Sequence, residues 1–503
     1  MTLAWTLFAV YLLATAWLGW RGYRKTTGFG TFAVGNRAMN PVVVGIILAA
    51  SVSSASTFII NPGFVYVDGW SAWFHMVVAV GISFITMLAV LSFRFRRMGA
   101  DSSALTMPDW IGKRYDSRGF ALFFALLNLL SFAFVVLLVG GISIVMQALL
   151  GVSNTTALII TLVFVTGYVF VGGTYAHVLT NLLQGSLMIV VALAVVASCV
   201  AVAINDPGSV VDRLRSLDPG LVAAVNRDGA LFNDVFSIYV AGFVIGAIIV
   251  CQPHILTKAM YVKDDRDVRI YLVVFAAVFL LFQLLGTVGF AARLAVPEAA
   301  LIDPTTGVFR QDLVMTMYLR EIFPDAAFTF ISVVLLAAAM STLDGLLVSI
   351  STITANDLVL NLVSRNTRLD EEQRMAFALR ASHVVLVVIA VAAFLINLQP
   401  PRLLGIFGQT GVYGLAAAAA IPLLMGVLFH RLPVALVWTG SAAALAIHFL
   451  LFFAGERLFP ASSLTFGNPG VTAAIAALIS MPATWLAGLA YRRYRGAASL
   501  ESA

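Results

Sequence analysis

Long apolar runs recur from one end of this 503-residue chain to the other. Each run approaches the roughly 20 residues that an α-helix needs to cross the hydrocarbon core of a bilayer. Thirteen runs fit this description: 3–20, 40–67, 70–93, 119–150, 155–171, 178–203, 235–252, 270–295, 326–356, 381–397, 403–428, 432–454 and 468–491. The pattern predicts an all-α polytopic membrane protein with about 13 transmembrane helices.

The composition excludes an ordinary soluble protein. Hydrophobic residues make up 61% of the chain and charged residues 11%, with a mean hydropathy of +0.98. The net charge of +6 comes from basic residues in short loops, so we expect the lipid bilayer and no nucleic acid as a partner. Cys199 and Cys251 lie inside apolar runs and indicate neither a disulfide framework nor a metal site. We expect no cofactor and no obligatory protein partner.

The basic residues also predict an orientation. Of the 30 Lys and Arg residues, 22 fall in one set of alternate loops and the remaining 8 in the other. The positive-inside rule then places the N-terminus outside and the C-terminus in the cytoplasm of the cell (inner) membrane, which agrees with an odd number of spans. We expect one membrane domain over 1–503, with a first helix and loop in 1–36, a core in 37–428, and two further helices with a short tail in 429–503.

The second span is a poor continuous helix for a lipid environment. Five hydroxyl residues fall within seven positions of it and Asn61-Pro62-Gly63 follows; the five are Ser51, Ser53, Ser54, Ser56 and Thr57. Unwound backbone is tolerated at membrane depth only where it is buried in protein or lines a cavity. We expect the helix to break between Ala50 and Ser54. The alternative is a small-residue packing face with a proline kink.

Two adjacent hydroxyls stand out in the ninth span. Ser341 and Thr342 lie in a bulky apolar segment, and Ala338 lies one turn earlier on the same helix face. Two hydroxyls together with freed carbonyls would form a neutral oxygen cage for a hard monovalent cation. The alternative is that these hydroxyls bond back to the preceding turn or hold membrane helices together.

The seventh span is interrupted as well. It contains Gly242 and Gly246, ends in Gln252-Pro253-His254, and runs opposite to the second span, which lies five spans earlier. Interrupted spans at matching places in two inverted halves point to the binding site of a transporter. The halves would be spans 2–6 and spans 7–11.

With these segments in view, the chain resembles the sodium/solute symporters, and within them the pantothenate and monocarboxylate branch. The motifs that carry the resemblance are Ser53-Ser54-Ala55-Ser56-Thr57-Phe58 with Pro62-Gly63, Ala338-x-x-Ser341-Thr342, Gly172-Gly173, Leu179-Thr180-Asn181-Leu182-Leu183-Gln184-Gly185, Pro253-His254 and Gln399-Pro400-Pro401. The resemblance implies a LeuT-type core of two inverted five-helix repeats with broken second and seventh spans.

It also implies a sodium site and a solute site. The implied sodium ligands are the carbonyls of Ala50, Ser53 and Ala338 and the hydroxyls of Ser341 and Thr342. Solute would lie beside the break, near Val52, Ser54 and Thr57. The chain departs from the family at Asn181, where many members have an aspartate tied to sodium coupling, and at Val52, where some have an aspartate. Asn181 is therefore a coupling candidate whose missing charge puts a second cation in doubt.

Other residues carry weaker signals. Tyr239 and Phe243 in the seventh span are candidates for gating the solute or stacking on it, although aromatic residues in spans usually serve packing. Asp344 follows the hydroxyl pair, and a helix-end or water-facing role is at least as good a reading as cation binding. His75 and His383 are expected to be structural; His177 is placed in a tight inner turn and His254 after a proline.

No constellation in the sequence supports an enzyme, since we find no His-Asp pair at short spacing, no paired carboxylates in a span and no metal cluster. We therefore expect sodium-coupled secondary active uptake of a small organic solute, best read as a monocarboxylate such as pantothenate, pyruvate, lactate or acetate. The alternative is a sodium/amino acid (proline-like) or sodium/sugar symporter.

Overall fold

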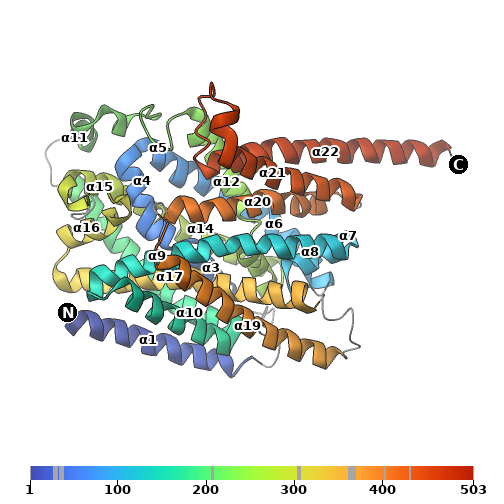
Figure 1. Ribbon diagram of the computed structural model, residues 1–503, viewed down its shortest axis with the longest axis horizontal. Helices are drawn as coiled ribbons and strands as arrows, with labels where there is room; N and C mark the ends of the chain where they lie inside the picture. Colours follow the sequence, from blue (N-terminus) through green and yellow to red (C-terminus); the bar gives the residue numbers. More distant parts are fainter. Residues whose placement is uncertain are drawn as a thin grey trace.

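The computed structural model describes residues 2–26, 32, 39–102, 104–204, 209–302, 307–360, 370–401, 404–429 and 432–501. The described chain is built from helices (Figure 1). Its N-terminal half contains α1 (Thr2–Tyr23), α3 (Pro41–Val52), η1 (Ser56–Ile60), α4 (Asn61–Asp68), α5 (Trp70–Trp73), η2 (Phe74–Val80), α6 (Gly81–Ser102), α7 (Met107–Tyr115), α8 (Arg118–Leu127), η3 (Asn128–Ser131), α9 (Phe132–Leu150) and α10 (Asn154–Ile204). The boundary that we expected at 36/37 lies outside the described residues.

The chain continues through a second series of helices. These are α11 (Val210–Leu217), η4 (Pro219–Val222), η5 (Phe236–Val240), α12 (Ala241–Ile249), α13 (Pro253–Leu256), η6 (Thr257–Tyr261), α14 (Asp265–Gln283), η7 (Leu284–Thr287), α15 (Val288–Ala295), η8 (Glu298–Leu301), η9 (Gln311–Leu313), α16 (Val314–Ile322), α17 (Asp325–Ile353), η10 (Thr354–Val359), α19 (Glu371–Asn397), α20 (Leu404–Leu428), α21 (Val434–Leu458) and α22 (Pro469–Glu501).

The described helices account for the thirteen predicted spans. Ten are long and apolar enough to cross a membrane, and two bent pairs of helices bring the number to twelve. Helix α10 supplies the thirteenth, because its 51 residues would stretch roughly 77 Å as one helix, more than twice a bilayer core. It is divided at Gly173, whose φ of +52° interrupts the helix and where a Cβ atom would meet the Phe32 ring at 2.3 Å.

Both predicted interruptions are sharp bends. Helices Pro41–Val52 and Ser56–Asp68 meet at 56°, and helices Phe236–Ile249 and Pro253–Tyr261 meet at 60°. The first break is the one expected between Ala50 and Ser54, displaced toward Ser53–Ala55. The seventh span, predicted to end at Gln252, continues to Tyr261. Its break falls at the Gln252-Pro253 step, where Pro253 is the first residue of α13, and α12 is continuous through Gly242 and Gly246.

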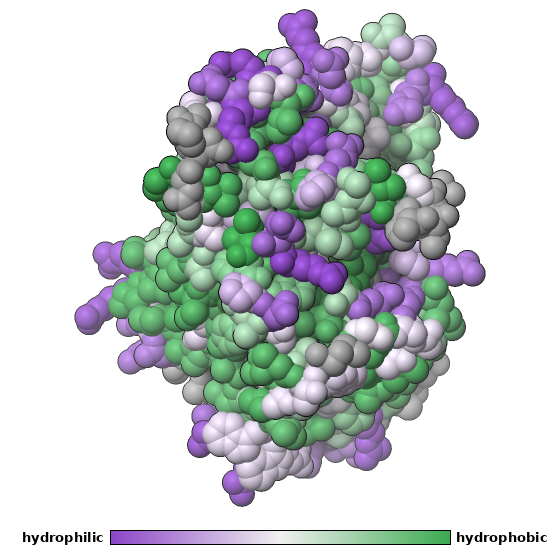
Figure 2. Space-filling view, turned by 90° about the vertical axis from the view of Figure 1, so that its left-hand side faces the viewer, coloured by the Kyte–Doolittle hydropathy of each residue, from purple (hydrophilic) through white to green (hydrophobic). Residues whose placement is uncertain are grey.

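The two ends of the chain lie at opposite ends of the bundle. Figure 1 shows α1 beginning at the left and α22 ending at the right, as an odd number of spans requires. Figure 2 looks onto the end where α1 begins and shows hydrophilic residues over the middle and upper part of that face, with hydrophobic residues among and around them. Along the sides, Leu13, Val163, Val273 and Phe453 are 70–73% exposed, which suits contact with lipid.

Helices α17 and α20 form the centre of the bundle. In their most apolar windows, 78% of the residues of α17 and 83% of those of α20 are buried, whereas α1 and α19 have 28%. Helix α3 packs against α10, α14 and α17, so the first break lies against the most enclosed part of the fold. This position brings the backbone of the second span to the hydroxyls of the ninth.

Candidate cation and solute sites

The first break releases backbone carbonyls from their helical partners. The Ser54 N–H donates to the carbonyl of Val52 at 3.1 Å, so it does not serve the carbonyl of Ala50 four residues earlier. The hydroxyl of Ser54 then accepts from the Ser56 N–H at 3.1 Å, which starts the next helical segment. Ser53 has φ −85° and ψ 78° and closes α3. The cluster of serines therefore replaces helical bonds with local ones.

The hydroxyls of α17 meet those carbonyls. The Ser341 hydroxyl lies 2.9 Å from the carbonyl oxygen of Ala50 and 2.7 Å from that of Ala338. The Thr342 hydroxyl lies 2.8 Å from the carbonyl oxygen of Ser51. Residues 291 positions apart thus bring five oxygens together in a fully enclosed place, since Ser341 and Ala50 are 0% exposed and Thr342 is 1% exposed.

Four of the five expected cation ligands gather directly in this cluster. They are Ala50, Ala338, Ser341 and Thr342, and Ser51 joins them although the sequence reading did not include its carbonyl. Ser53, the fifth, is also 0% exposed, and its hydroxyl has no hydrogen-bond partner. Hydroxyl and carbonyl oxygens without a formal charge suit a hard monovalent cation, and rotation of the two hydroxyl hydrogens would turn oxygen lone pairs inward.

Asn181 is attached to the same cluster. Its amide nitrogen donates to the Ser51 hydroxyl at 2.9 Å and to the Ser341 carbonyl at 3.0 Å, while its Oδ1 has no partner. The side chain therefore ties α10 to both the break and α17. A carboxylate at position 181 could not donate these two hydrogen bonds. The amide is therefore the group that suits this position in the present chain.

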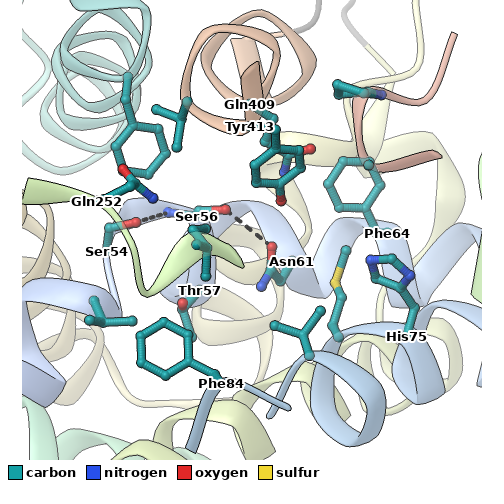
Figure 3. A pocket seen from close by; sticks show the side chains of 18 of the residues that line it. Ser54, Ser56, Thr57, Asn61, Phe64, His75, Phe84, Gln252, Gln409 and Tyr413 are labelled. Atoms are coloured by element: carbon teal, nitrogen blue, oxygen red, sulfur yellow. Dashed lines mark hydrogen bonds between the residues drawn. The ribbon is translucent and has the colours of Figure 1, made fainter. Parts of the chain in front are cut away.

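A cavity of about 120 Å³ lies on the other side of the break (Figure 3). Val52, Ser54 and Thr57, the expected solute residues, all line it, and so does Ser51. The break thus contributes to the cation cluster on one side and to the cavity on the other. Neighbouring residues of one short segment serve both places.

The cavity has polar walls that the sequence reading missed. Amide side chains line it from several helices, together with Tyr413 and two histidines; the amides are Asn61, Gln252, Gln283, Gln409 and Asn468 and the histidines His75 and His254. Gln252 is 2% exposed and its Oε1 has no hydrogen-bond partner. Among these residues, Gln252 could have been predicted to line the cavity, because it lies at the second break. Gln409 and Asn468 lie in spans 11 and 13, where no local sequence feature indicates a role in binding.

No Asp, Glu, Lys or Arg lines this cavity in the described part of the chain. His75, read as structural, stands in its wall and has its Nδ1 at 2.8 Å from the Ser237 carbonyl oxygen. The ring therefore has a structural bond as well as a place facing the cavity. Hydrogen bonds and apolar contacts, rather than ion pairs with side chains, are what this cavity offers to a solute.

Tyr239 and Phe243 do not reach the cavity. Phe243 is 51% exposed on the outer side of α12. The Tyr239 hydroxyl donates to the Ala224 carbonyl at 3.2 Å, and its ring packs against Phe74 at 6.1 Å between centroids. Helix α12 instead turns Gly242 and Gly246 toward η2 and α6, where a Cβ on Gly246 would come within 2.4 Å of the Val80 carbonyl. The close approach of these helices sends the two aromatic side chains away from the cavity.

Asp344 is not at a helix end and does not face water, which corrects the sequence reading. It is 0% exposed and accepts hydrogen bonds from Tyr168 at 3.0 Å and Thr180 at 3.2 Å, with His177 Nδ1 at 2.9 Å. His177 belongs to the second half of α10, beyond the break at Gly173, rather than to a turn. His383 is stacked on Phe170 at 3.9 Å and lies outside both sites.

The described residues contain no group of three or more His, Cys, Asp or Glu side chains arranged to hold a metal ion. This leaves the neutral oxygen cluster between the break and α17 as the cation candidate. The model of the sodium:solute symporter family matches residues 32–435, most of the chain.

The chain belongs to the sodium:solute symporter family. Similar relatives include the sodium/pantothenate symporters of Haemophilus influenzae (26% identical, covering 85% of this chain and 85% of the relative) and Escherichia coli (26%, 81% and 82%). The osmoregulated proline transporter of Bacillus subtilis is 24% identical over 78% of this chain and 77% of its own.

Solved structures agree on the fold. A sodium-coupled sialic acid symporter in a substrate-bound outward-open state matches with a TM-score of 0.72 and 15% identity, covering 95% of this chain and 96% of its own. The symporter therefore has the LeuT-type fold, with two inverted repeats and broken second and seventh spans. Its activity is sodium-coupled solute transport, and the solute is not fixed by this membership.

Proposed function

We propose that this symporter takes up a small monocarboxylate together with sodium, which binds between the first break and α17. The proposal depends on the observation that one segment, the first break, takes part in both the cation cluster and the solute cavity. Ser51 offers its carbonyl to Thr342 and also lines the cavity with Val52 and Ser54. A cation held by Ala50, Ser53, Ala338, Ser341 and Thr342 would fix this segment and so shape the solute cavity.

Sodium in this cluster replaces hydrogen bonds by ion–oxygen contacts. The hydroxyls of Ser341 and Thr342 each donate to a carbonyl, and an ion would be held by these hydroxyl and carbonyl oxygens together. The coupling is reciprocal, because a solute that favours the same conformation of the break raises sodium affinity by the same factor. The membrane potential contributes ~2.3 kcal/mol for each positive charge per 100 mV.

The cavity suits one carboxylate without requiring an arginine. The helical segment that begins at Ser56 directs its positive end toward the break, and helix N-termini attract anions. Thr57 adds a hydroxyl, and Gln252 adds a side-chain amide whose NH2 group can donate to a carboxylate. The likeness to sodium/pantothenate symporters supports the same class of solute. The absence of charged lining residues in the described cavity favours neutral or zwitterionic solutes, such as an amino acid, as the second candidate.

Uptake into proteoliposomes tests the proposal. With pantothenate, pyruvate, lactate, acetate, proline and glucose offered in turn, we expect accumulation of a monocarboxylate when sodium is outside, and none when choline replaces it. Accumulation that is unchanged in choline and driven by a proton gradient would contradict sodium coupling. Sodium-dependent uptake of proline or glucose with no carboxylate transported would replace the proposed solute and leave the sodium site standing.

A further inference from the structure

A second, smaller cavity lies beyond the second break, on the far side of His254 from the solute cavity. It measures about 30 Å³, room for a water-sized species, and His254 lines both cavities. Its walls come from α13 and η6, from the second half of α17, and from the segment that follows α6. Arg94, Arg96 and Lys263 lie toward this end of the bundle, which the basic-residue count predicts to be cytoplasmic.

A buried lysine lines this cavity, and among the described residues its ammonium group has one hydrogen-bond acceptor. Lys258 is 1% exposed. An ammonium group carries three donors, and the bond found for it is to the His254 carbonyl at 2.9 Å. Within the described chain no carboxylate lies within 4.0 Å of Lys258 Nζ.

Asp344, the nearest candidate for a counter-ion, is already occupied. Its two oxygens accept from Tyr168 and Thr180 and lie against His177, all three on α10. Among the described residues Asp344 makes no direct bond with Lys258. A buried cation that lacks an acceptor for its remaining donors is costly, so an acceptor is needed at the cavity.

Other lining residues also present unpartnered polar atoms. His177 Nε2, His254 Nδ1 and the Thr352 hydroxyl are buried and have no hydrogen-bond partner, and their residues are 2%, 6% and 4% exposed. Together with the ammonium of Lys258 they surround a small, positively charged space. His177 Nδ1 faces the Asp344 carboxylate, so a neutral His177 presents Nε2 as an acceptor. The donors available to an anion are Lys258, the Thr352 hydroxyl and His254 in its Nδ1–H tautomer. Such a space suits a monovalent anion or one carboxylate group.

We propose that this second cavity is a binding subsite for a monoanionic group, held by Lys258 with His254 and Thr352, which receives the carboxylate of the solute on its way to the cytoplasm. The role in release rests on the proposed function, whereas the anion site itself does not. The solute cavity lacks a lysine or arginine, so a carboxylate moving past His254 would exchange amide and hydroxyl contacts for an ammonium. A free halide offers the same chemistry.

Bromide in sodium-free choline buffer tests the site without sodium or solute. We expect an anomalous scattering peak beside Lys258 Nζ in crystals of the whole protein, and a melting temperature at least about 2 °C higher in choline bromide than in choline gluconate. The stabilisation should persist in Lys258→Arg and vanish in Lys258→Met. His383→Gln, which alters a histidine that lines neither cavity, should behave like the wild type.

The absence of a bromide peak, with equal melting temperatures in the two salts, would overturn the anion site and leave water as the occupant. This result does not depend on whether the variant folds, because it is measured on the unaltered protein. Failure of the proposed function would look different: bromide would bind, but no carboxylate would be accumulated with sodium.

Counterflow in proteoliposomes distinguishes the two sources of the anion. If the subsite receives the solute's carboxylate, bromide inside the vesicles should slow counterflow of the transported carboxylate severalfold in the wild type and not in Lys258→Met. Bromide binding without any effect on counterflow would support the anion site but assign it to a free halide.

Discussion

The two broken spans bend by nearly the same angle, 56° and 60°, yet they do so by different chemistry. At the first break, serine hydroxyls and a short backbone bond divert the N–H groups of Ser54 and Ser56 from helical partners. At the second, Pro253 has no N–H to give and begins a new helix. The first break leaves backbone carbonyl oxygens without helical partners. The second break places the side chains around Pro253 in the walls of two cavities.

Because of this difference, the two inverted halves contribute to different sites. The first break supplies neutral oxygens that meet Ser341 and Thr342, which is the chemistry of a cation site. The second supplies Gln252 to the solute cavity, Lys258 to the inner cavity and His254 to both. Changes at the first break and its partner helix should therefore affect sodium most, and changes at the second should affect the solute or its release.

The largest effect is expected from removing the hydroxyls of both Ser341 and Thr342 on α17. Ser341→Ala with Thr342→Ala should lower apparent sodium affinity about a hundredfold, since a hydrogen bond or ligand contact to a charged group contributes about 1.5 kcal/mol or more. Sodium dependence of uptake measures this. Ser351→Ala removes a buried hydroxyl of the same helix that bonds only to the Val348 carbonyl and should leave sodium affinity unchanged. Unchanged sodium dependence in the double variant would remove the site from α17.

The second-largest effect is expected from Asn181→Asp. The carboxylate cannot donate to the Ser51 hydroxyl and the Ser341 carbonyl, so the sodium-free protein should lose about 2 kcal/mol of stability. A cation in the adjacent cluster would offset the new charge, so sodium should raise the melting temperature more in this variant than in the wild type. Thermal unfolding with and without sodium measures both. Equal sodium-induced shifts in the two proteins would show that position 181 is uncoupled from the cation.

Gln252→Leu tests the second break, where we expect an effect on solute binding rather than on sodium binding. Gln252 lines the cavity and its Oε1 has no partner among the described residues, so we expect loss of the amide to weaken solute binding about tenfold while sodium affinity in the absence of solute stays unchanged. Binding of labelled solute and of sodium to purified protein separates the two. Gln147→Leu, at the exposed end of α9 outside the cavity, is the matched control. A larger loss of sodium affinity than of solute affinity would reverse the division between the breaks.

The smallest effect is expected at Phe243. Its side chain is half exposed on the outer side of α12, so Phe243→Ala should change solute affinity by less than about twofold. Solute binding by the purified variant measures this. A tenfold loss would mean that α12 rotates during transport and brings this ring to the solute.

Much of the fold followed from local sequence. Run length alone located the thirteen spans, because a bilayer imposes one length on every helix that crosses it. The serine cluster located the first break, and Gln252-Pro253-His254 marked the seventh span as interrupted, because competing hydroxyls and a proline each remove helical hydrogen bonds without help from distant residues. The hydroxyl pair of α17 was also visible, since polar oxygens in an apolar helix need a partner somewhere.

The tertiary structure decided which residues face which space. Nothing near Phe243 in sequence says that α12 turns its glycines inward, and nothing near Asp344 says that Tyr168, Thr180 and His177 will enclose it. Gln409 and Lys258 acquire meaning only from cavities built by other helices. The length of a span follows from its run of hydrophobic residues, and the position of a break follows from the residues that remove helical hydrogen bonds. Both are local properties of the sequence. The facing of a side chain depends on the rotation of its helix, which is set by packing against neighbours far away in the chain.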